Sequence, residues 1–287
     1  MIDEKTFAFD ASDGRKIAAY RWRTEPVRAV LQIAHGMGEH SRRYFEPLAP
    51  LIDSGIAVYA NDHRGHGASE PSAASLGDFG PRGFAALVDD MASLTQIIRR
   101  ENPGAKIILL GHSMGSFAAQ LYVLEHSALI DGLVLSGSAA FDLLALPRGE
   151  GSALESLNTV MAQPRTPFDW LSRDEREVDK YLADPLCGFS VDEAAMHSIF
   201  ASSAAAADPA RLARIRSDLP VYIFAGQLDP VNAGMTRMWP LVDRYRKAGL
   251  ADLTTDFYAD GRHEMLNETN RAEVVANLTA WIERVIA

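Results

Sequence analysis

Two patterns of apolar residues alternate along most of the chain. Short continuous apolar runs, such as "KIILL" and "VYIFA", are typical of strands buried on both faces of a parallel sheet. Between such runs, apolar residues recur every three or four positions, as at 84, 87, 88, 91, 94, 97 and 98, which predicts amphipathic helices. The alternation predicts an α/β protein with a mostly parallel, doubly wound sheet.

The beginning and the end of the chain extend this prediction. The runs "TFAFDASDG" and "KIAAYRWR" predict a hairpin that turns at Asp13 and Gly14. Residues 42–54 are expected to form a helix that stops at Gly55, and residues 274–285 have the spacing of a final helix. No internal repeat interrupts this order.

The pattern changes between residues 141 and 217, where helical spacing continues without a convincing strand. "SRDE" and "SVDE" match capping boxes, with Ser172 and Ser190 as N-caps and Glu175 and Glu193 three positions later. We therefore expect residues 1–140 and 218–287 to form a core domain and 141–217 a helical cap, or lid, over the carboxyl edge of the sheet. The alternative is an ordinary crossover without a role at the site.

Composition excludes several classes of protein. The chain has 287 residues and a net charge of −10, which argues against nucleic acid or an anionic membrane surface as the main partner. Cys187 is the single cysteine, so no internal disulfide can form. The first ten residues do not resemble a secretory signal, and no apolar run approaches 18 residues. We expect a cytoplasmic protein with at most peripheral membrane contact through the cap.

The stretch "KIILLGHSMGSFAAQL" carries the clearest chemical signal, because a serine stands where a strand turns into a helix. The pattern G-x-S-x-G is weak by itself, and the strand before it and the helix after it give it weight. Gly111 and Gly115 lack Cβ atoms, so the strand and the helix can approach each other across the turn. Ser113 is therefore predicted to be a nucleophile presented at the carboxyl edge of the sheet.

A serine nucleophile needs a base within hydrogen-bond reach. Three histidines follow Ser113 in the chain. His126 lies at the far end of the helix that follows the serine, and His197 lies in the predicted cap. His263, in the loop before the last helix, is the predicted base by elimination.

The base in turn needs an acid to orient it, and in this fold the acid precedes the histidine in the chain. Asp229 ends the strand "VYIFAGQLDP", and the following proline fixes the turn. Asp256 lies inside the last predicted strand, and Asp260 is too close to His263 in sequence. Asp229 is the predicted acid, and the alternative is a simple Asp-Pro turn.

Negative charge that develops on the substrate oxygen requires fixed N–H donors. The backbone N–H of Met114, directly after the nucleophile, is one predicted donor. The second is expected from the loop "AHGMGEHSRRY", where Met37 follows His35 and Gly36. These two N–H groups form the predicted oxyanion hole, and the alternative for the loop is a plain glycine turn.

The loop "NDHRGHGAS" offers a different chemistry. Asp62, His63 and His66 could be interpreted as metal ligands, but no further histidine or cysteine cluster accompanies them. Structural hydrogen bonding near the active-site edge is the preferred interpretation, with Arg64 holding the loop. We therefore predict no metal.

Taken together and in order, "HGMGEHSRRY", "NDHRGHGAS", "GHSMGS", "LSGS", the Asp-Pro pair and "GRHE" resemble the α/β-hydrolase superfamily. The resemblance is specifically to its monoacylglycerol lipase and lysophospholipase-like branch, which is also grouped with the serine aminopeptidases of type S33. It implies the triad Ser113, Asp229 and His263, the oxyanion hole of Met37 and Met114, and catalysis without a cofactor. It also implies ester substrates such as monoacylglycerols and lysophospholipids.

The expected reaction is therefore hydrolysis of a carboxylic ester through an acyl-enzyme. The expected substrate is a small-molecule or single-chain lipid ester. An aminopeptidase or amidase of the same fold and a non-catalytic ligand-binding protein remain open, as does the oligomeric state. Apolar residues of the cap are expected to line an acyl channel above the serine: Leu143, Leu144, Leu146, Leu154, Leu157, Val160, Met161, Phe168 and Trp170.

Overall fold

The chain folds around one eight-stranded sheet, and the computed structural model describes residues 1–70, 72–144 and 152–287. The strand order is β1-β2-β4-β3-β5-β6-β7-β8. β2 pairs antiparallel with both β1 and β4, and every other pair is parallel. The strands are β1 (Asp3–Asp10), β2 (Lys16–Arg23), β3 (Ala29–Ala34), β4 (Ile56–Asn61), β5 (Lys106–His112), β6 (Gly132–Ser136), β7 (Val221–Gly226) and β8 (Leu253–Tyr258). The predicted α/β class, the mostly parallel sheet and the initial hairpin are confirmed.

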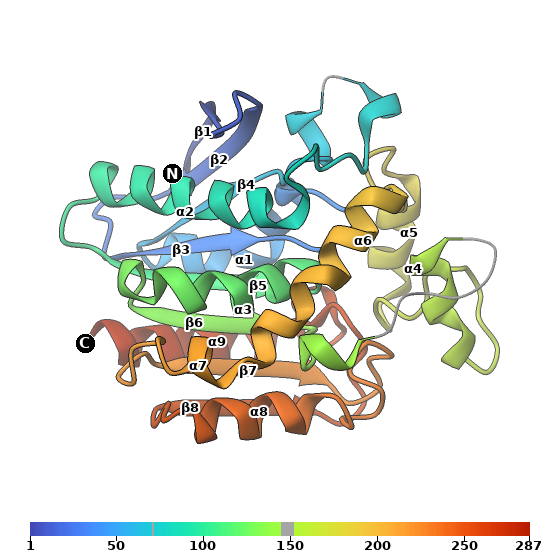
Figure 1. The fold of residues 1–287 in the computed structure, drawn as a ribbon. Helices are drawn as coiled ribbons and strands as arrows, with labels where there is room; N and C mark the ends of the chain where they lie inside the picture. Colours follow the sequence, from blue (N-terminus) through green and yellow to red (C-terminus); the bar gives the residue numbers. More distant parts are fainter. Residues whose placement is uncertain (71, 145–151) are drawn as a thin grey trace.

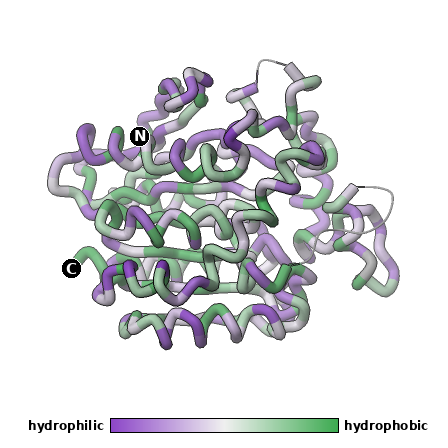
Figure 2. Tube along the Cα trace, in the orientation of Figure 1, coloured by the Kyte–Doolittle hydropathy of each residue, from purple (hydrophilic) through white to green (hydrophobic). Residues whose placement is uncertain are grey.

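Helices cover both faces of the sheet, and each face has its own hydrophobic core (Figure 1). On one face, α1 (Phe45–Asp53) and α9 (Arg271–Ile286) bury apolar residues such as Leu51 and Leu278. The other face is covered by α2 (Gly83–Glu101), α3 (Met114–His126) and α8 (Met238–Lys247). The tube view shows the hydrophobic residues along the central strands between these layers (Figure 2). Continuous apolar runs form the strands because both strand faces are buried.

A helical segment enters between β6 and β7, and its described residues 152–217 are called the helical insertion below. It contains α4 (Ala153–Ser156), α5 (Glu175–Ala183), α6 (Glu193–Ser202) and α7 (Pro209–Leu212), together with short 3-10 turns. Within these described residues there is no strand, as predicted. Figure 1 shows α4 and α5 on the right, beyond the ends of the central strands. Of the rest of the predicted cap, residues 141–144 contain a 3-10 turn (Phe141–Leu143), and residues 145–151 lie outside the described residues.

The two predicted capping boxes are wrong. α5 begins at Glu175 with Asp174 as its N-cap, and the Asp174 side chain accepts a hydrogen bond from the backbone of Arg176. In the same way, Asp192 caps α6. The hydroxyl of Ser172 instead donates to the carbonyl of Asn267 and accepts from the N–H of Asp174. An aspartate one position before the helix is a better-placed cap than a serine three positions before it.

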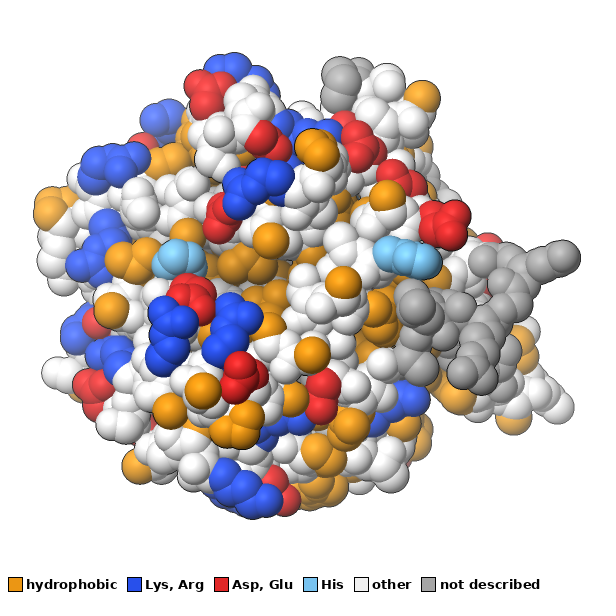
Figure 3. Space-filling model, viewed as in Figure 1, with side chains coloured by type: hydrophobic (Ala, Val, Ile, Leu, Met, Phe, Trp, Pro, Cys, Tyr) orange, Lys and Arg blue, Asp and Glu red, His pale blue; other side chains and the backbone are white. Residues whose placement is uncertain are grey.

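The surface in Figure 3 carries acidic and basic side chains side by side, with no extended area of one sign on this face.

No helix in the described part of the chain combines the length and apolar character that crossing a bilayer requires.

Candidate active site

Ser113 lies at a sharp turn between β5 and α3, where its backbone is strained. Its φ is 52° and its ψ is −123°, a conformation that side chains other than glycine rarely adopt. A Cβ atom on Gly111 would lie 2.5 Å from the carbonyl oxygen of Gly115, and one on Gly115 would overlap the carbonyl oxygen of Ala34. The two predicted elbow glycines are thus the places where β5, α3 and β3 approach most closely, and this packing enforces the strain at the serine.

The structure brings His263 and Asp229 into contact, although 34 residues separate them in the chain. The Nδ1 atom of His263 lies 2.9 Å from Oδ2 of Asp229, and both side chains are buried. The second oxygen of Asp229 accepts a hydrogen bond of 2.8 Å from the N–H of Val231, which fixes the carboxylate. A carboxylate on Nδ1 leaves Nε2 as the free basic nitrogen of the ring.

Ser113 and His263 line the same narrow hollow, together with Met37 and Trp170. Within the described structure, no hydrogen bond joins the Ser113 hydroxyl to the imidazole. Such bonds often become short only when a substrate is bound. The ring of Trp170 lies 4.8 Å from the ring of His263, centroid to centroid, and shields it from water.

The surroundings of His263 set its protonation. Burial opposes the imidazolium, but the charge and the hydrogen bond of Asp229 outweigh it and raise the pKa of His263 above 6.5. The neighbouring His112, 4.7 Å away between ring centroids, has its pKa lowered to about 4 by burial and by the His263 charge. At neutral pH, His112 is therefore uncharged and does not compete for the proton.

Two residues that line the larger cavity beside Ser113 have backbone N–H groups without a protein acceptor in the described structure. In the described part of the chain, neither Met37 nor Met114 donates its backbone N–H to a protein group, although both residues line the cavity with Ser113. Unpaired buried N–H groups are rare and are typical of sites that receive an oxygen atom. Unpaired N–H groups beside the serine are what the predicted oxyanion hole requires, and the oxyanion hole itself stays a prediction.

A buried ion network that the sequence did not reveal holds this loop. Arg43 donates to Glu39 at 2.6 Å and to both oxygens of Glu264 at 2.7 Å. Glu39 accepts a further bond from the N–H of Gly36, next to Met37, and another from the hydroxyl of Tyr44. Burial opposes the ionisation of Glu39, but Arg43 and its neighbours hold the pKa of Glu39 at about 2.

The network connects the predicted oxyanion loop to the loop that carries His263, because Glu264 is the next residue. The only sequence signal was the presence of "GEHSRRY" and "GRHE" among the motifs. Charged residues are normally exposed, so nothing in a single sequence indicated that these three are buried together.

The loop after β4 is structural, as preferred above. Asp62 accepts hydrogen bonds from the N–H groups of Ser41 and Ala68 and from the hydroxyl of Tyr20. Arg64 is fully buried and binds Asp90. Arg64 also binds Asp13 and donates to the carbonyl of Phe79, so it holds the loop in place, as predicted for this arginine.

The histidines of these loops are also engaged. His35 accepts from the N–H of His63 at 2.9 Å, and His66 accepts from the N–H of Gly38 at 3.2 Å. Burial lowers the pKa of His66 to about 3. His35 and His66 therefore act as neutral hydrogen-bonding groups that shape the loop containing Met37.

The side chains rejected as triad members lie elsewhere. His126 is the last residue of α3, and His197 is exposed on α6 beside Glu193. Asp256 accepts a hydrogen bond of 2.6 Å from the hydroxyl of Tyr222. Neither histidine lines a cavity with Ser113 in the described structure.

A cavity of about 270 Å³ opens between Ser113 and the helical insertion. Small-molecule sites typically occupy about 300–1,000 Å³, so this cavity is at the lower end. Its described wall is mostly apolar and comprises Met37, Ser113, Met114, Phe117, Leu144, Ala153, Leu154, Ser156, Leu157, Met196, Ile199, Phe200, Val231 and Arg237.

Only some of the side chains predicted to line an acyl channel line this cavity. Leu144, Leu154 and Leu157 line the cavity, whereas Leu143 and Val160 are exposed. The other predicted positions that the structure describes, Met161, Phe168 and Trp170, are absent from its wall, and Leu146 lies outside the described residues. Three side chains of α6 that the sequence analysis did not select complete the wall: Met196, Ile199 and Phe200.

The sheet order, the strained serine after β5 and the His–Asp pair after β8 and β7 define an α/β-hydrolase fold. Comparison with known proteins agrees. Residues 25–270 match the family of serine aminopeptidases S33, known as Hydrolase_4. The chain therefore belongs to this family of α/β-hydrolases, in the monoacylglycerol lipase and lysophospholipase-like group that the motifs indicated.

Two relatives and one solved structure show how similar this chain is to known proteins. Human monoglyceride lipase is 34% identical over 183 residues, which cover 61% of this chain and 58% of that protein. Monoacylglycerol lipase of Mycolicibacterium smegmatis is 30% identical over 269 residues, covering 90% of this chain and 89% of that protein. A carboxyl esterase from Bacillus coagulans, solved with glycerol, has a TM-score of 0.88 at 27% identity and full coverage of both chains. The match to the human protein thus spans less than two thirds of its length.

Proposed function

We propose that this protein is a serine esterase that hydrolyses carboxylic esters of single-chain lipids through an acyl-enzyme. The observation that carries the proposal is the strained Ser113, which lines both a mostly apolar cavity with Met37 and Met114 and an adjoining narrow hollow with His263, the partner of Asp229. The names of the relatives, monoglyceride lipase and monoacylglycerol lipase, agree with it.

In the proposed mechanism, the Ser113 hydroxyl attacks the ester carbonyl while Nε2 of His263 accepts its proton. Asp229 holds the ring in the required tautomer and stabilises the imidazolium that forms. The N–H groups of Met37 and Met114 bind the developing oxyanion. His263 then protonates the leaving alcohol, and a water molecule activated by the same ring releases the acid.

The helical insertion acts as the cap in this proposal. Leu154, Leu157 and Ile199 of the insertion supply apolar area to the wall of the cavity. Each buried methylene of an acyl chain gains about 0.8 kcal/mol, which corresponds to about a four-fold increase in kcat/KM. An acyl channel therefore predicts a steep rise with chain length until the cavity is full.

The test is kcat/KM for p-nitrophenyl and glycerol esters from two carbons upward. The expected profile rises several-fold per methylene, and Ser113→Ala abolishes turnover of every ester while keeping the thermal unfolding of the parent protein. A flat profile or strict preference for acetate contradicts a lipid substrate. Residual activity above about one part in a thousand in Ser113→Ala contradicts the nucleophile, because losing a triad serine costs about 10⁶ in kcat.

One feature of the wall favours a lysophospholipid over a monoacylglycerol. Arg237 is the single charged residue among the described residues that line the cavity. Its guanidinium donates to the carbonyl of Val231 at 3.2 Å, and within the described structure no carboxylate forms an ion pair with it. A half-buried arginine without a counter-charge is suited to bind a phosphate oxygen.

Esters of one acyl chain with glycerol and with glycerol phosphate separate the two substrates. If Arg237 binds the phosphate, Arg237→Gln raises KM for the phosphorylated ester several-fold and leaves the neutral ester unchanged. Arg100→Gln, at the exposed end of α2, is the control and changes neither. An equal effect of Arg237→Gln on both esters contradicts phosphate recognition and leaves monoacylglycerol as the better substrate.

A further inference from the structure

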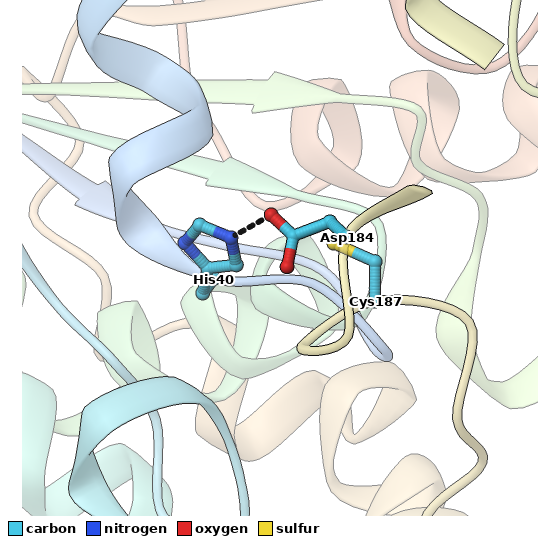
Figure 4. Close-up of side chains that lie close together, drawn as sticks. All are labelled: His40, Asp184 and Cys187. Carbon is cyan, nitrogen blue, oxygen red and sulfur yellow. Dashed lines mark hydrogen bonds and ion pairs between the residues drawn. The ribbon is translucent and has the colours of Figure 1, made fainter. Parts of the chain in front are cut away.

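Three side chains that commonly bind metal ions meet outside the active site. His40 follows the loop of Met37, whereas Asp184 and Cys187 lie in the turn after α5 (Figure 4). The Nε2 atom of His40 lies 2.9 Å from Oδ2 of Asp184. These two atoms and Sγ of Cys187 all lie within 4.8 Å of one another. The core and the helical insertion thus both contribute ligand atoms to one small cluster.

The backbone around the cluster is well fixed on both sides. The N–H of Cys187 donates to the carbonyl of Asp184 at 3.0 Å, which closes a turn that brings the two side chains together. The N–H of Leu186 donates to Oδ1 of Asp184 and leaves Oδ2 directed at His40. The N–H of Gly188 and the hydroxyl of Tyr181 both donate to the carbonyl of Gly38, two residues before His40.

We propose that His40, Asp184 and Cys187 form a binding site for Zn²⁺ that joins the helical insertion to the loop of the core. Imidazole nitrogen, thiolate sulfur and carboxylate oxygen are the three ligand types that zinc prefers in proteins. His40 and Asp184, but not Cys187, line a hollow of about 560 Å³, so a metal ion and a water molecule as the fourth ligand can approach from the side of these two residues.

The distances require only small movements. Zinc bonds of about 2.0–2.1 Å to nitrogen and oxygen place two such ligands about 3.3 Å apart in a tetrahedron. The corresponding atoms of His40 and Asp184 are now 2.9 Å apart, so they separate by a few tenths of an ångström. The sulfur of Cys187 approaches to about 3.6 Å from the nitrogen, which a side-chain rotation can supply.

The charges of the ligands also balance. The Asp184 carboxylate and a Cys187 thiolate together neutralise one Zn²⁺ ion. Each cation that lines the hollow has a carboxylate partner: Arg42 binds Glu4, Arg43 binds Glu264, and Lys180 binds Glu46 and Glu177. Their charges are therefore largely compensated at the cluster.

Zinc binding must displace a proton. Burial raises the pKa of the Cys187 thiol above its usual value, so the sulfur is protonated in the metal-free protein. When the Zn–S bond forms, the S–H bond breaks and the proton passes to solvent, and zinc also replaces any hydrogen shared between His40 and Asp184.

Cobalt titration tests the site directly, because Co²⁺ replaces Zn²⁺ and gives a charge-transfer band when it binds a thiolate. Cys187 is the single cysteine of the chain, so such a band has one possible source. We expect one equivalent of Co²⁺ to produce the band, and one equivalent of Zn²⁺ to remove it and to raise the melting temperature. Binding without the band, or no binding, overturns the proposal.

Variants locate the ligands. Cys187→Ser should abolish the cobalt band, and Cys187→Ser, His40→Gln and Asp184→Asn should each weaken Zn²⁺ binding at least about ten-fold. His197→Asn is the matched control, because His197 and Glu193 form an exposed His–carboxylate pair on α6 that could bind zinc non-specifically. Each metal-free variant is first compared with the parent protein by thermal unfolding, and a variant that unfolds is left out in favour of the other two.

The alternatives give different results. If zinc affinity falls in His197→Asn but not in the folded variants of the cluster, the binding is a surface effect and the proposal is wrong. It is equally wrong if Asp229→Asn, at the candidate active site, is the variant that loses zinc. Because this test measures metal binding and not hydrolysis, it is independent of the proposed esterase activity.

Discussion

The loops at the carboxyl edge of the sheet and the helical insertion above them are held in different ways. In the edge loops, Arg43 and its partners Glu39 and Glu264 have side chains that are 11%, 4% and 6% exposed. In the insertion, the pair of Arg165 and Asp179 is 41% and 59% exposed. Buried ion pairs lose much when one partner is removed, whereas exposed pairs contribute little.

This difference corresponds to two tasks at one cavity. The groups proposed for the chemical step need positions fixed to a fraction of an ångström, and a buried, multiply bonded network supplies that rigidity. A wall for an acyl chain needs only apolar area of suitable shape. Short helices provide such a wall, and residues within and between them, such as Tyr181 and Trp170, also contact the edge loops.

The largest effect is expected from a change in the edge loops alone. Asp229→Asn keeps the shape of the side chain but should lower kcat for ester hydrolysis by about 10⁴, because the amide favours the wrong tautomer of His263. Asp256→Asn is the matched control, since Asp256 lies in β8 and accepts a hydrogen bond from Tyr222 of β7. Kinetics with one p-nitrophenyl ester measure both, and a greater loss in Asp256→Asn would assign the acid to the wrong residue.

The same contrast explains which parts of the site could be predicted from sequence. The turn at Ser113 was predicted because a buried strand, two glycines and a helix follow one another there, and the strained backbone of the serine agrees with that prediction. Asp229 and His263 were predicted to lie together because strand ends meet at one edge of a parallel sheet, and their side chains are in contact. These signals are local or follow from topology.

The missed features depend on tertiary packing. Met196 and Phe200 reach the cavity because α6 packs beside α2 and above the sheet, and their spacing alone was equally consistent with an ordinary core. Ser172 was chosen as a helix cap, but its hydroxyl bonds to Asn267, 95 residues later. No single-sequence pattern reports such long-range competition for a hydrogen bond.

A second prediction compares the two kinds of ion pair directly. Arg43→Met leaves two buried carboxylates without their partner and should lower the free energy of unfolding by about 3–5 kcal/mol. Arg165→Met, in the helical insertion, should change it by less than about 1 kcal/mol. Urea unfolding measures both variants, and equal effects would show that the edge loops are no more rigidly held than the insertion.

The ion network should also make the free energy of unfolding depend on pH. The pKa of Glu39 is held at about 2, below its usual 4.5, so its contribution to stability is present above about pH 4.5. It is lost as the pH falls towards 2. The loss of stability between these values should therefore be smaller in Arg43→Met than in the parent protein.

A third prediction concerns the charge state of His263. Only the neutral ring can accept the serine proton, so kcat/KM should fall about ten-fold per pH unit below the pKa of His263. Because Asp229 raises that pKa, the midpoint of the acid limb should lie above 6.5. The pH profile of kcat/KM measures it. A midpoint near 4 would instead identify His112, whose pKa is about 4, as the group that titrates.

The smallest expected effect is confined to the helical insertion. Phe200 lines the cavity from α6, so Phe200→Ala removes apolar area without touching Ser113 or the ion network. We expect kcat/KM for long-chain esters to fall several-fold and that for acetate to stay unchanged, because only a long chain reaches this wall. Leu182→Ala, on the exposed side of α5, is the matched control and should leave the whole chain-length profile unaltered. If Phe200→Ala slowed acetate and long-chain esters equally, the insertion would be contributing to the chemical step itself, and the division of labour between the two regions would not hold.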